Sequence, residues 1–296
     1  MKEFKLTIKD SSLSFLSGFL LCQLGAVVAT CFAMIVYKFT NANMENFSSF
    51  LNTGVGYLIT ALGLYLVMLL MFCFFNKGKQ NQTTEKVNPK KLLIYIGIAI
   101  VSFLTLYPIV TCIDSLLFKW GIELNTLPYA LTTKNYYISL ISLVIAPAVC
   151  EELLFRGLIF KGLKKHGKVL SITISALMFC LFHMSISQTV YPILMGLLLG
   201  VIMYHENNIY YCIAVHMTNN FLSLTLSYFK INLLFNHWTY ILLAIILFVA
   251  FLSAVLFFVI KTHKDEEKQP VTKIEKIYLI SSITIMLLFW VLVNFV

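Results

Sequence analysis

The sequence predicts an all-α protein, a polytopic transmembrane helical bundle of about eight or nine spans. Of the 296 residues, 59% are hydrophobic and only 12% are charged, with a mean hydropathy of +0.87. A soluble domain carries about 25% charged residues. Apolar runs of about 20 residues, enough to cross a hydrocarbon core of ~30 Å as a helix, recur along the whole chain. No polar stretch between them is long enough to fold as a soluble domain.

Nine apolar segments are the candidate spans. The first is too long for the core of a signal peptide and lacks a persuasive cleavage site, so we expect it to be retained. The division of 189–229 into helices is the least constrained. In chain order the candidate spans cover residues 13–37, 53–75, 92–118, 137–160, 169–185, 189–204, 209–229, 238–260 and 277–296.

The chain divides into three parts by the density of polar groups in its apolar segments. Residues 1–136 are expected to form accessory N-terminal transmembrane helices, and residues 230–296 C-terminal transmembrane helices. The part between them, 137–229, is expected to be the catalytic core. All seven cysteines fall inside apolar runs without a CxxC spacing, which predicts free thiols.

Lysines are unevenly distributed between alternate loops. With the N-terminus in the cytoplasm, 17 lysines fall in cytoplasmic segments and only four in segments on the opposite side. Because cytoplasmic loops are enriched in Lys and Arg, we predict a multi-pass membrane protein with a cytoplasmic N-terminus and an external C-terminus. The net charge of +9 then reflects topology and contact with membrane lipid, and no nucleic-acid partner is expected.

The fourth candidate span contains three ionisable residues, Glu151, Glu152 and Arg156. An ionised group at bilayer depth is costly, so it needs a partner or a function. Residues four apart share a helix face, which predicts a Glu152–Arg156 ion pair. Glu151 points about 100° away and has no local cation, so it is the candidate for proton transfer. The alternative is a purely structural pair, with Glu151 extending towards the membrane interface.

Two later spans carry imidazoles among apolar residues. His183 ends the fifth span, and His216 shares a helix face with Asn220 in the seventh. Each one alone is typical of a helix–helix hydrogen bond. Counted from the span ends at 1.5 Å per residue, however, Glu151 and both histidines reach similar depths near the membrane middle. We therefore expect them to share one pocket.

Hydrolysis is the chemistry that such a pocket supports. Glu151, aided by His183, would take a proton from a water molecule that attacks a peptide carbonyl, and His216 with Asn220 would donate hydrogen bonds to the oxyanion. Alternatively, Glu151, His183 and His216 would hold a divalent metal such as zinc. The sequence has no HExxH motif, and the water activated by glutamate is the favoured interpretation; no cofactor is required by it.

Three motifs, in this order on separate hydrophobic segments, resemble those of the CAAX protease and bacteriocin-processing (CPBP/ABI) family of intramembrane endopeptidases, which are glutamate-dependent and often classed as metalloproteases. The resemblance covers about residues 137–229. The motifs are Glu151-Glu152-x-x-x-Arg156, Phe179-x-x-x-His183 and His216-x-x-x-Asn220.

The resemblance implies roles for these residues. Glu151 would be the general base with His183 as its partner, and His216 and Asn220 would be the oxyanion donors. The structural or orienting residues would be Glu152, Arg156 and Phe179.

The substrate class does not follow from the resemblance. Members of the family cut prenylated CaaX proteins, process peptides, confer bacteriocin self-immunity or act as scaffolds. The expected partners are membrane lipid and a small membrane peptide or lipidated protein substrate. The competing functions are a non-catalytic membrane adaptor or immunity protein and, less favoured, a proton-coupled transporter, which usually shows two related halves.

Overall fold

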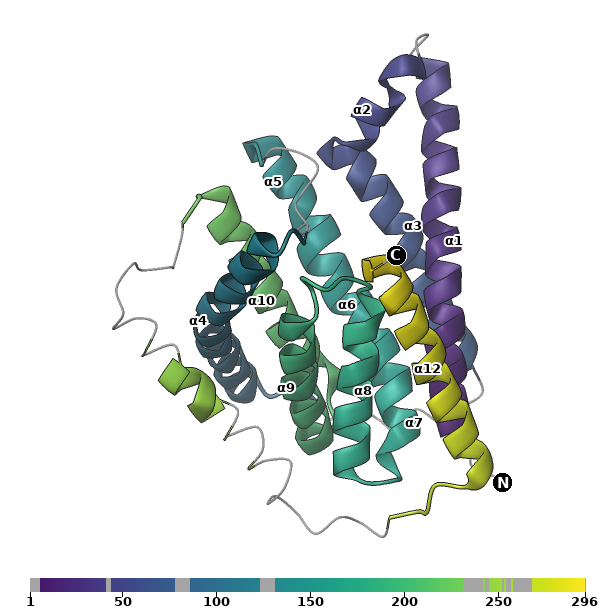
Figure 1. Ribbon diagram of the computed structural model, residues 1–296, viewed down its shortest axis with the longest axis vertical. Helices are drawn as coiled ribbons and strands as arrows, with labels where there is room; N and C mark the ends of the chain where they lie inside the picture. The colour runs from purple at the N-terminus through teal and green to yellow at the C-terminus, as the bar shows by residue number, and fades with distance from the viewer. Residues whose placement is uncertain are drawn as a thin grey trace.

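The protein is a bundle of helices, seen in a computed structural model that describes residues 6–40, 44–77, 86–122, 131–231, 242, 245–251, 253, 257 and 268–295 (Figure 1). Within these residues there is no strand, and the predicted all-α membrane bundle is confirmed. The predicted span 238–260 lies largely outside them. The elements are α1 (Ile8–Thr40), the 3-10 turn η1 (Met44–Asn46), α2 (Phe47–Leu51), α3 (Gly54–Asn76), α4 (Pro89–Lys119), α5 (Thr133–Ser139), η2 (Leu140–Ile145), α6 (Ala146–Glu152), η3 (Leu153–Phe160), α7 (Lys161–Lys164), α8 (Lys168–Phe182), α9 (Val190–Glu206), α10 (Ile209–Tyr228) and α12 (Lys273–Phe295).

Five of the described helices are long and apolar enough to cross a membrane: α1, α3, α4, α12 and the continuous helix from α5 to α7. The helices α8 and α9 are apolar but have only 15 and 17 residues. At 1.5 Å per residue they extend about 23 and 26 Å, which is less than the ~30 Å core. The sequence therefore predicted the positions of these two helices in the chain. Their length, however, does not qualify either of them as a full membrane span.

Two consecutive asparagines form the turn between α9 and α10. Asn207 ends α9 in the left-handed conformation, with φ of 46°, which asparagine tolerates better than most residues. Asn208 then caps α10, because its side chain accepts a hydrogen bond from the backbone of Tyr210 at 3.0 Å. This two-residue turn makes α9 and α10 neighbours and places His216 in the third turn of α10.

The helix from α5 to α7 is enclosed by the other helices. Half of its most apolar 18-residue window is buried, against 11–28% for the other four long helices. On one side lie α1, α3 and α12, and on the other lie α4, α9 and α10 (Figure 1). Of the five long helices described it is the most enclosed, and this enclosure is why it tolerates ionisable residues.

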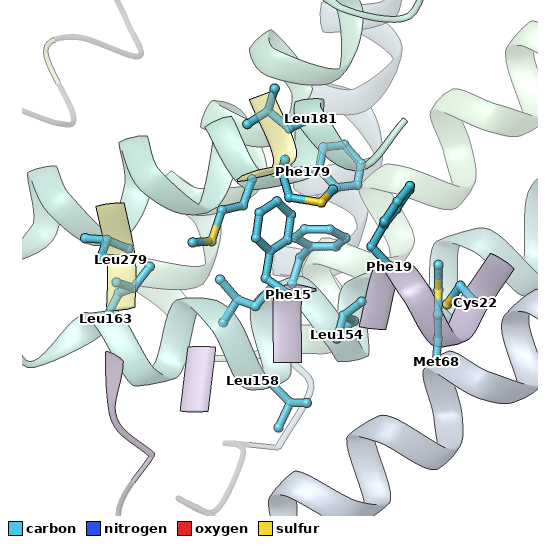
Figure 2. Packing of buried hydrophobic residues seen from close by; sticks show 14 of the residues in the cluster. Phe15, Phe19, Cys22, Met68, Leu154, Leu158, Leu163, Phe179, Leu181 and Leu279 are labelled. Carbon is cyan, nitrogen blue, oxygen red and sulfur yellow. The ribbon is translucent and has the colours of Figure 1, made fainter. Parts of the chain in front are cut away.

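Two hydrophobic clusters flank the central helix. The first joins Phe15 of α1, Met68 of α3, Leu154 of η3, Phe179 of α8 and Leu279 of α12 (Figure 2). The second packs α4, α9 and α10 against the opposite face of the helix and against α8. The first cluster therefore contains side chains from all three parts into which the sequence was divided.

The start of α4, the short α7 and the start of α12 all carry lysines and lie together at one end of the bundle, called here the lysine-rich end (Figure 1). Lys91 at the start of α4 pairs with Glu206 at the end of α9 at 2.7 Å. Lys165, which follows α7, pairs with Glu275 at the start of α12 at 3.4 Å. The described lysines that the sequence analysis assigned to one side of the membrane thus lie at one end of the fold. The seven cysteines are free, as predicted.

The helices α1 and α3 approach closely because each has a glycine at the crossing. A Cβ atom on Gly25 would lie 2.6 Å from the carbonyl oxygen of Gly63, which is closer than real Cβ contacts. Small residues allow such backbone contact, and the van der Waals packing that follows is a main source of helix association in membranes. The crossing fixes α3 against the central helix.

We expect Gly25→Ala to lower the melting temperature of the detergent-solubilised protein, because overpacking costs about 1–3 kcal/mol. The matched control is Gly97→Ala in α4, where an added Cβ meets nothing within 4 Å. Alanine is the better helix former, so the control should be neutral or stabilising. Equal melting temperatures for the two variants would contradict the close crossing.

Candidate active site

The backbone of the central helix is wider on both sides of the two glutamates. The six residues of η2 and the eight of η3 form π-helical turns, and the short α6 between them carries Glu151 and Glu152. Pro147, near the start of α6, cannot donate a backbone hydrogen bond. Wide turns of this kind often occur at functional sites, because they turn side chains away from the regular helical positions.

A buried network of charges surrounds Glu152. Its Oε1 atom accepts hydrogen bonds from Nη1 of Arg156 at 3.0 Å and from Nδ1 of His216 at 2.9 Å. The side chains of Glu152 and Arg156 are fully buried. Nη2 of Arg156 donates to the carbonyl oxygen of Gly196 in α9 at 3.2 Å. The predicted Glu152–Arg156 ion pair is confirmed, and it connects the central helix to α9 and α10.

Glu151 is held far less tightly than its neighbour. Its Oε2 atom lies 3.9 Å from Nε2 of His216, which is longer than a hydrogen bond, and its side chain is 14% exposed. A carboxylate accepts hydrogen bonds, so the bond to Glu152 places a hydrogen on Nδ1 of His216 and turns Nε2 towards Glu151. The imidazole of His216 thus stands between a fixed carboxylate and one that remains available.

Phe179 lies at the centre of these groups. The guanidinium carbon of Arg156 lies 4.8 Å from the centroid of its ring, a cation–π contact. The rings of His183 and His216 meet the same ring edge-on, with centroid distances of 4.9 and 5.9 Å. The buried aromatic ring therefore separates the two imidazoles and gives each a fixed orientation.

His183 is oriented by the backbone of its own helix. Its Nδ1 atom donates a hydrogen bond to the carbonyl oxygen of Phe179 at 2.9 Å, since a carbonyl can only accept. In the neutral ring Nε2 then carries the lone pair. Both histidines are thus anchored through Nδ1 and offer Nε2.

Two expected contacts are not present in the described part of the chain. No hydrogen bond or ion pair joins Glu151 to His183, and the half-buried Asn220 forms no hydrogen bond there. Its neighbour Asn219 is the buried one. Asn219 accepts a hydrogen bond from the hydroxyl of Tyr191 at 2.6 Å and donates one to the carbonyl of Val215 at 2.9 Å.

The Tyr191–Asn219 contact was not predicted from the sequence. The Asn219-Asn220 doublet is visible in the sequence, but the spacing from His216 selected only its second member. The partner on α9 has no sequence signal of its own, because tyrosine is a common interfacial residue in membrane proteins.

The metal alternative is not supported by the arrangement of the donors. Among the described residues, no three His, Cys, Asp or Glu side chains lie close enough together to hold a metal ion. Glu151, His183 and His216 therefore do not form a metal site in this arrangement.

The Glu152–Arg156 pair provides a stability test. Glu152→Gln and Arg156→Met should each destabilise the protein by about 3–5 kcal/mol, because each leaves a buried charge without its partner. The double variant removes both charges and should cost less than the sum of the single variants. Thermal unfolding in detergent measures this. Additive losses would show that the two charges do not stabilise each other.

The family comparison covers the helices that carry this site. Residues 133–222 match the family model described as type II CAAX prenyl endopeptidase Rce1-like. The matched segment extends from the first residue of α5 into α10 and contains every candidate site residue. No curated protein and no solved structure matches the chain. Over these residues, about a third of its length, the chain is similar to the type II CAAX prenyl endopeptidases of the Rce1-like family.

Proposed function

We propose that this protein is an intramembrane endopeptidase that hydrolyses a peptide bond in a membrane-associated or lipidated substrate. The observation that carries the proposal is the difference between adjacent carboxylates. Glu152 is fully buried and bonded to Arg156 and His216, whereas Glu151 is partly exposed and bonded to neither. A general base must be reached by water, and of these two residues only Glu151 is accessible, since the second oxygen of Glu152 has no hydrogen-bond partner but is buried.

In the proposed reaction, Glu151 removes a proton from a water molecule while the water oxygen bonds to the carbonyl carbon of the substrate. Nε2 of His183 accepts the second hydrogen bond of this water, because Nδ1 is already committed to the carbonyl of Phe179. The C–N bond then breaks, and the proton held by Glu151 passes to the leaving amine. No other reactant is needed.

His216 and Asn220 are the proposed oxyanion donors. With a proton on Nε2, His216 donates to the oxyanion while Glu152 holds the ring through Nδ1 at 2.9 Å. The amide of Asn220 is on the same face of α10, one turn further along. Donors aimed at a developing oxyanion are worth about 2.7–4 kcal/mol each. The absence of a hydrogen bond from Asn220 to the described residues is consistent with a group that awaits substrate.

Glu151→Gln and His183→Ala should each lower kcat by about 100-fold or more, because loss of a positioned base or its partner removes acid–base catalysis. The assay offers small membrane peptides and lipidated peptide tails to the purified protein in lipid vesicles. Glu206→Gln is the matched control, since this carboxylate pairs with Lys91 at the far end of α9. Cleavage that persists undiminished in both site variants would refute the proposed site.

A chelator in the same assay distinguishes the reaction of a glutamate-activated water from a metal-dependent reaction. The reaction driven by Glu151 and His183 should retain its rate after dialysis against a chelator. Inhibition that zinc reverses would overturn the glutamate–water mechanism in favour of a metal held by a different arrangement of these residues.

A non-catalytic adaptor or immunity role is the second candidate. The missing contact between Glu151 and His183 in the described structure is the observation behind it, because catalysis needs a base and its partner within hydrogen-bond reach of the same water in the substrate complex. In this case Glu151→Gln would leave the biological activity of the protein intact while the wild type cleaves no substrate.

We propose further that the lysine-rich end faces the cytoplasm. Lys90 and Lys134 are exposed at opposite ends of the bundle. In a background without the native cysteines, a membrane-impermeant maleimide should label Lys134→Cys in intact cells and Lys90→Cys only after permeabilisation. The reverse pattern would invert the topology.

A further inference from the structure

The last turn of α12 contacts the segment that follows His183. Oδ1 of Asn294 accepts a hydrogen bond from the backbone N–H of Ile186 at 2.7 Å. Its Nδ2 donates to the carbonyl oxygen of Met184 at 3.3 Å and to that of Trp290, in its own helix, at 2.7 Å. One amide side chain thus binds the backbone on both sides of Ser185.

These bonds define a single orientation for the amide. A primary amide has two N–H donors and one carbonyl oxygen, and Asn294 uses both donors and the oxygen. Rotating the amide by 180° would place its oxygen against two carbonyl oxygens and its NH₂ group against the N–H of Ile186. The contact is therefore specific for asparagine and not a general polar contact.

The backbone that Asn294 binds is strained next to His183. Met184 has a φ of 51°, in the left-handed region that a residue with a side chain rarely adopts. His183 is the last residue before it and caps α8. Among the described residues, its ring is hydrogen-bonded through Nδ1 to the carbonyl of Phe179 and meets the Phe179 ring edge-on. If Met184 relaxed to an ordinary conformation, the end of α8 and the direction of the His183 ring would change with it.

We propose that Asn294 is a positioning residue for His183: it holds Met184 in the left-handed conformation, and this keeps Nε2 of His183 directed at the reacting water. The proposal rests on the proposed function, because it assumes that His183 acts in hydrolysis. Asn294 lies outside the family-matched residues 133–222. In this proposal, α12, which carries none of the three motifs, also contributes a residue that supports the site.

The closing experiment compares Asn294→Ala and Asn294→Asp with Val293→Ala, a neighbouring residue whose side chain is 63% exposed. The Asp variant preserves size but faces two carbonyl oxygens with an acceptor. Both Asn294 variants should lower kcat by about 100-fold with KM unchanged, the effect of a misplaced catalytic group. Val293→Ala should match the wild type.

A spectroscopic measurement reports on His183 independently of activity. In protein labelled with ¹⁵N-histidine, the His183 signals are identified by their loss in His183→Ala. Asn294→Ala should shift them away from the Nδ1–H form, while the signals of His166 remain unchanged. Unchanged His183 signals would overturn the proposal, whether or not any substrate is cleaved. A wild type that cleaves nothing would refute the proposed function alone.

A second substitution distinguishes positioning from simple docking of α12. Glycine adopts positive φ without strain, so Met184→Gly in the Asn294→Ala background should restore part of the lost kcat and the His183 signals. If Asn294 served only to attach α12, Met184→Gly would restore neither, and the positioning role would be excluded.

Discussion

The structure depends on the pairing of one buried carboxylate. Glu152 lies in the most enclosed helix of an apolar bundle, where an unpaired charge would be severely destabilising. Its partners come from η3 and from α10, and the guanidinium of Arg156 extends to Gly196 of α9 and the ring of Phe179 of α8. The requirement to neutralise one charge thus holds η3, α8, α9 and α10 in fixed positions around Glu152 of α6.

This constraint also explains how adjacent glutamates differ. Neighbouring residues on a helix point about 100° apart, so Glu152 is hydrogen-bonded within the network whereas Glu151 reaches only its edge, 3.9 Å from Nε2 of His216. The same imidazole faces both, through Nδ1 for the first and Nε2 for the second. Fixing Glu152 therefore orients His216 beside Glu151 while leaving the oxygens of Glu151 without a hydrogen bond in the described structure. In the proposed mechanism, the reactive group and its support thus come from consecutive residues.

Whether the sequence predicted an interaction depended on how far apart the two partners lie in the chain. The Glu152–Arg156 pair is local, and helical spacing alone identified it. The bond from His216 to Glu152 joins residues 64 positions apart. The expected common depth placed His216 near Glu151, but the bond to Glu152 was not predicted. Asn219 and Asn220 differ by one position, and the choice between them depends on Tyr191, which spacing does not reveal. Hydropathy located α8 and α9 but does not distinguish a short buried helix from a full span.

The hydrophobic packing shows why the motifs alone do not describe the site. Leu154 and Phe179, on the helices that carry the motifs, pack in one cluster with Phe15 of α1 and Leu279 of α12 (Figure 2). The position of α8, and with it His183, is therefore set partly by helices outside residues 133–222. Packing densities like those of crystals transmit such shifts. Variation in α1 and α12 can thus change the geometry of the candidate site while every motif residue stays the same.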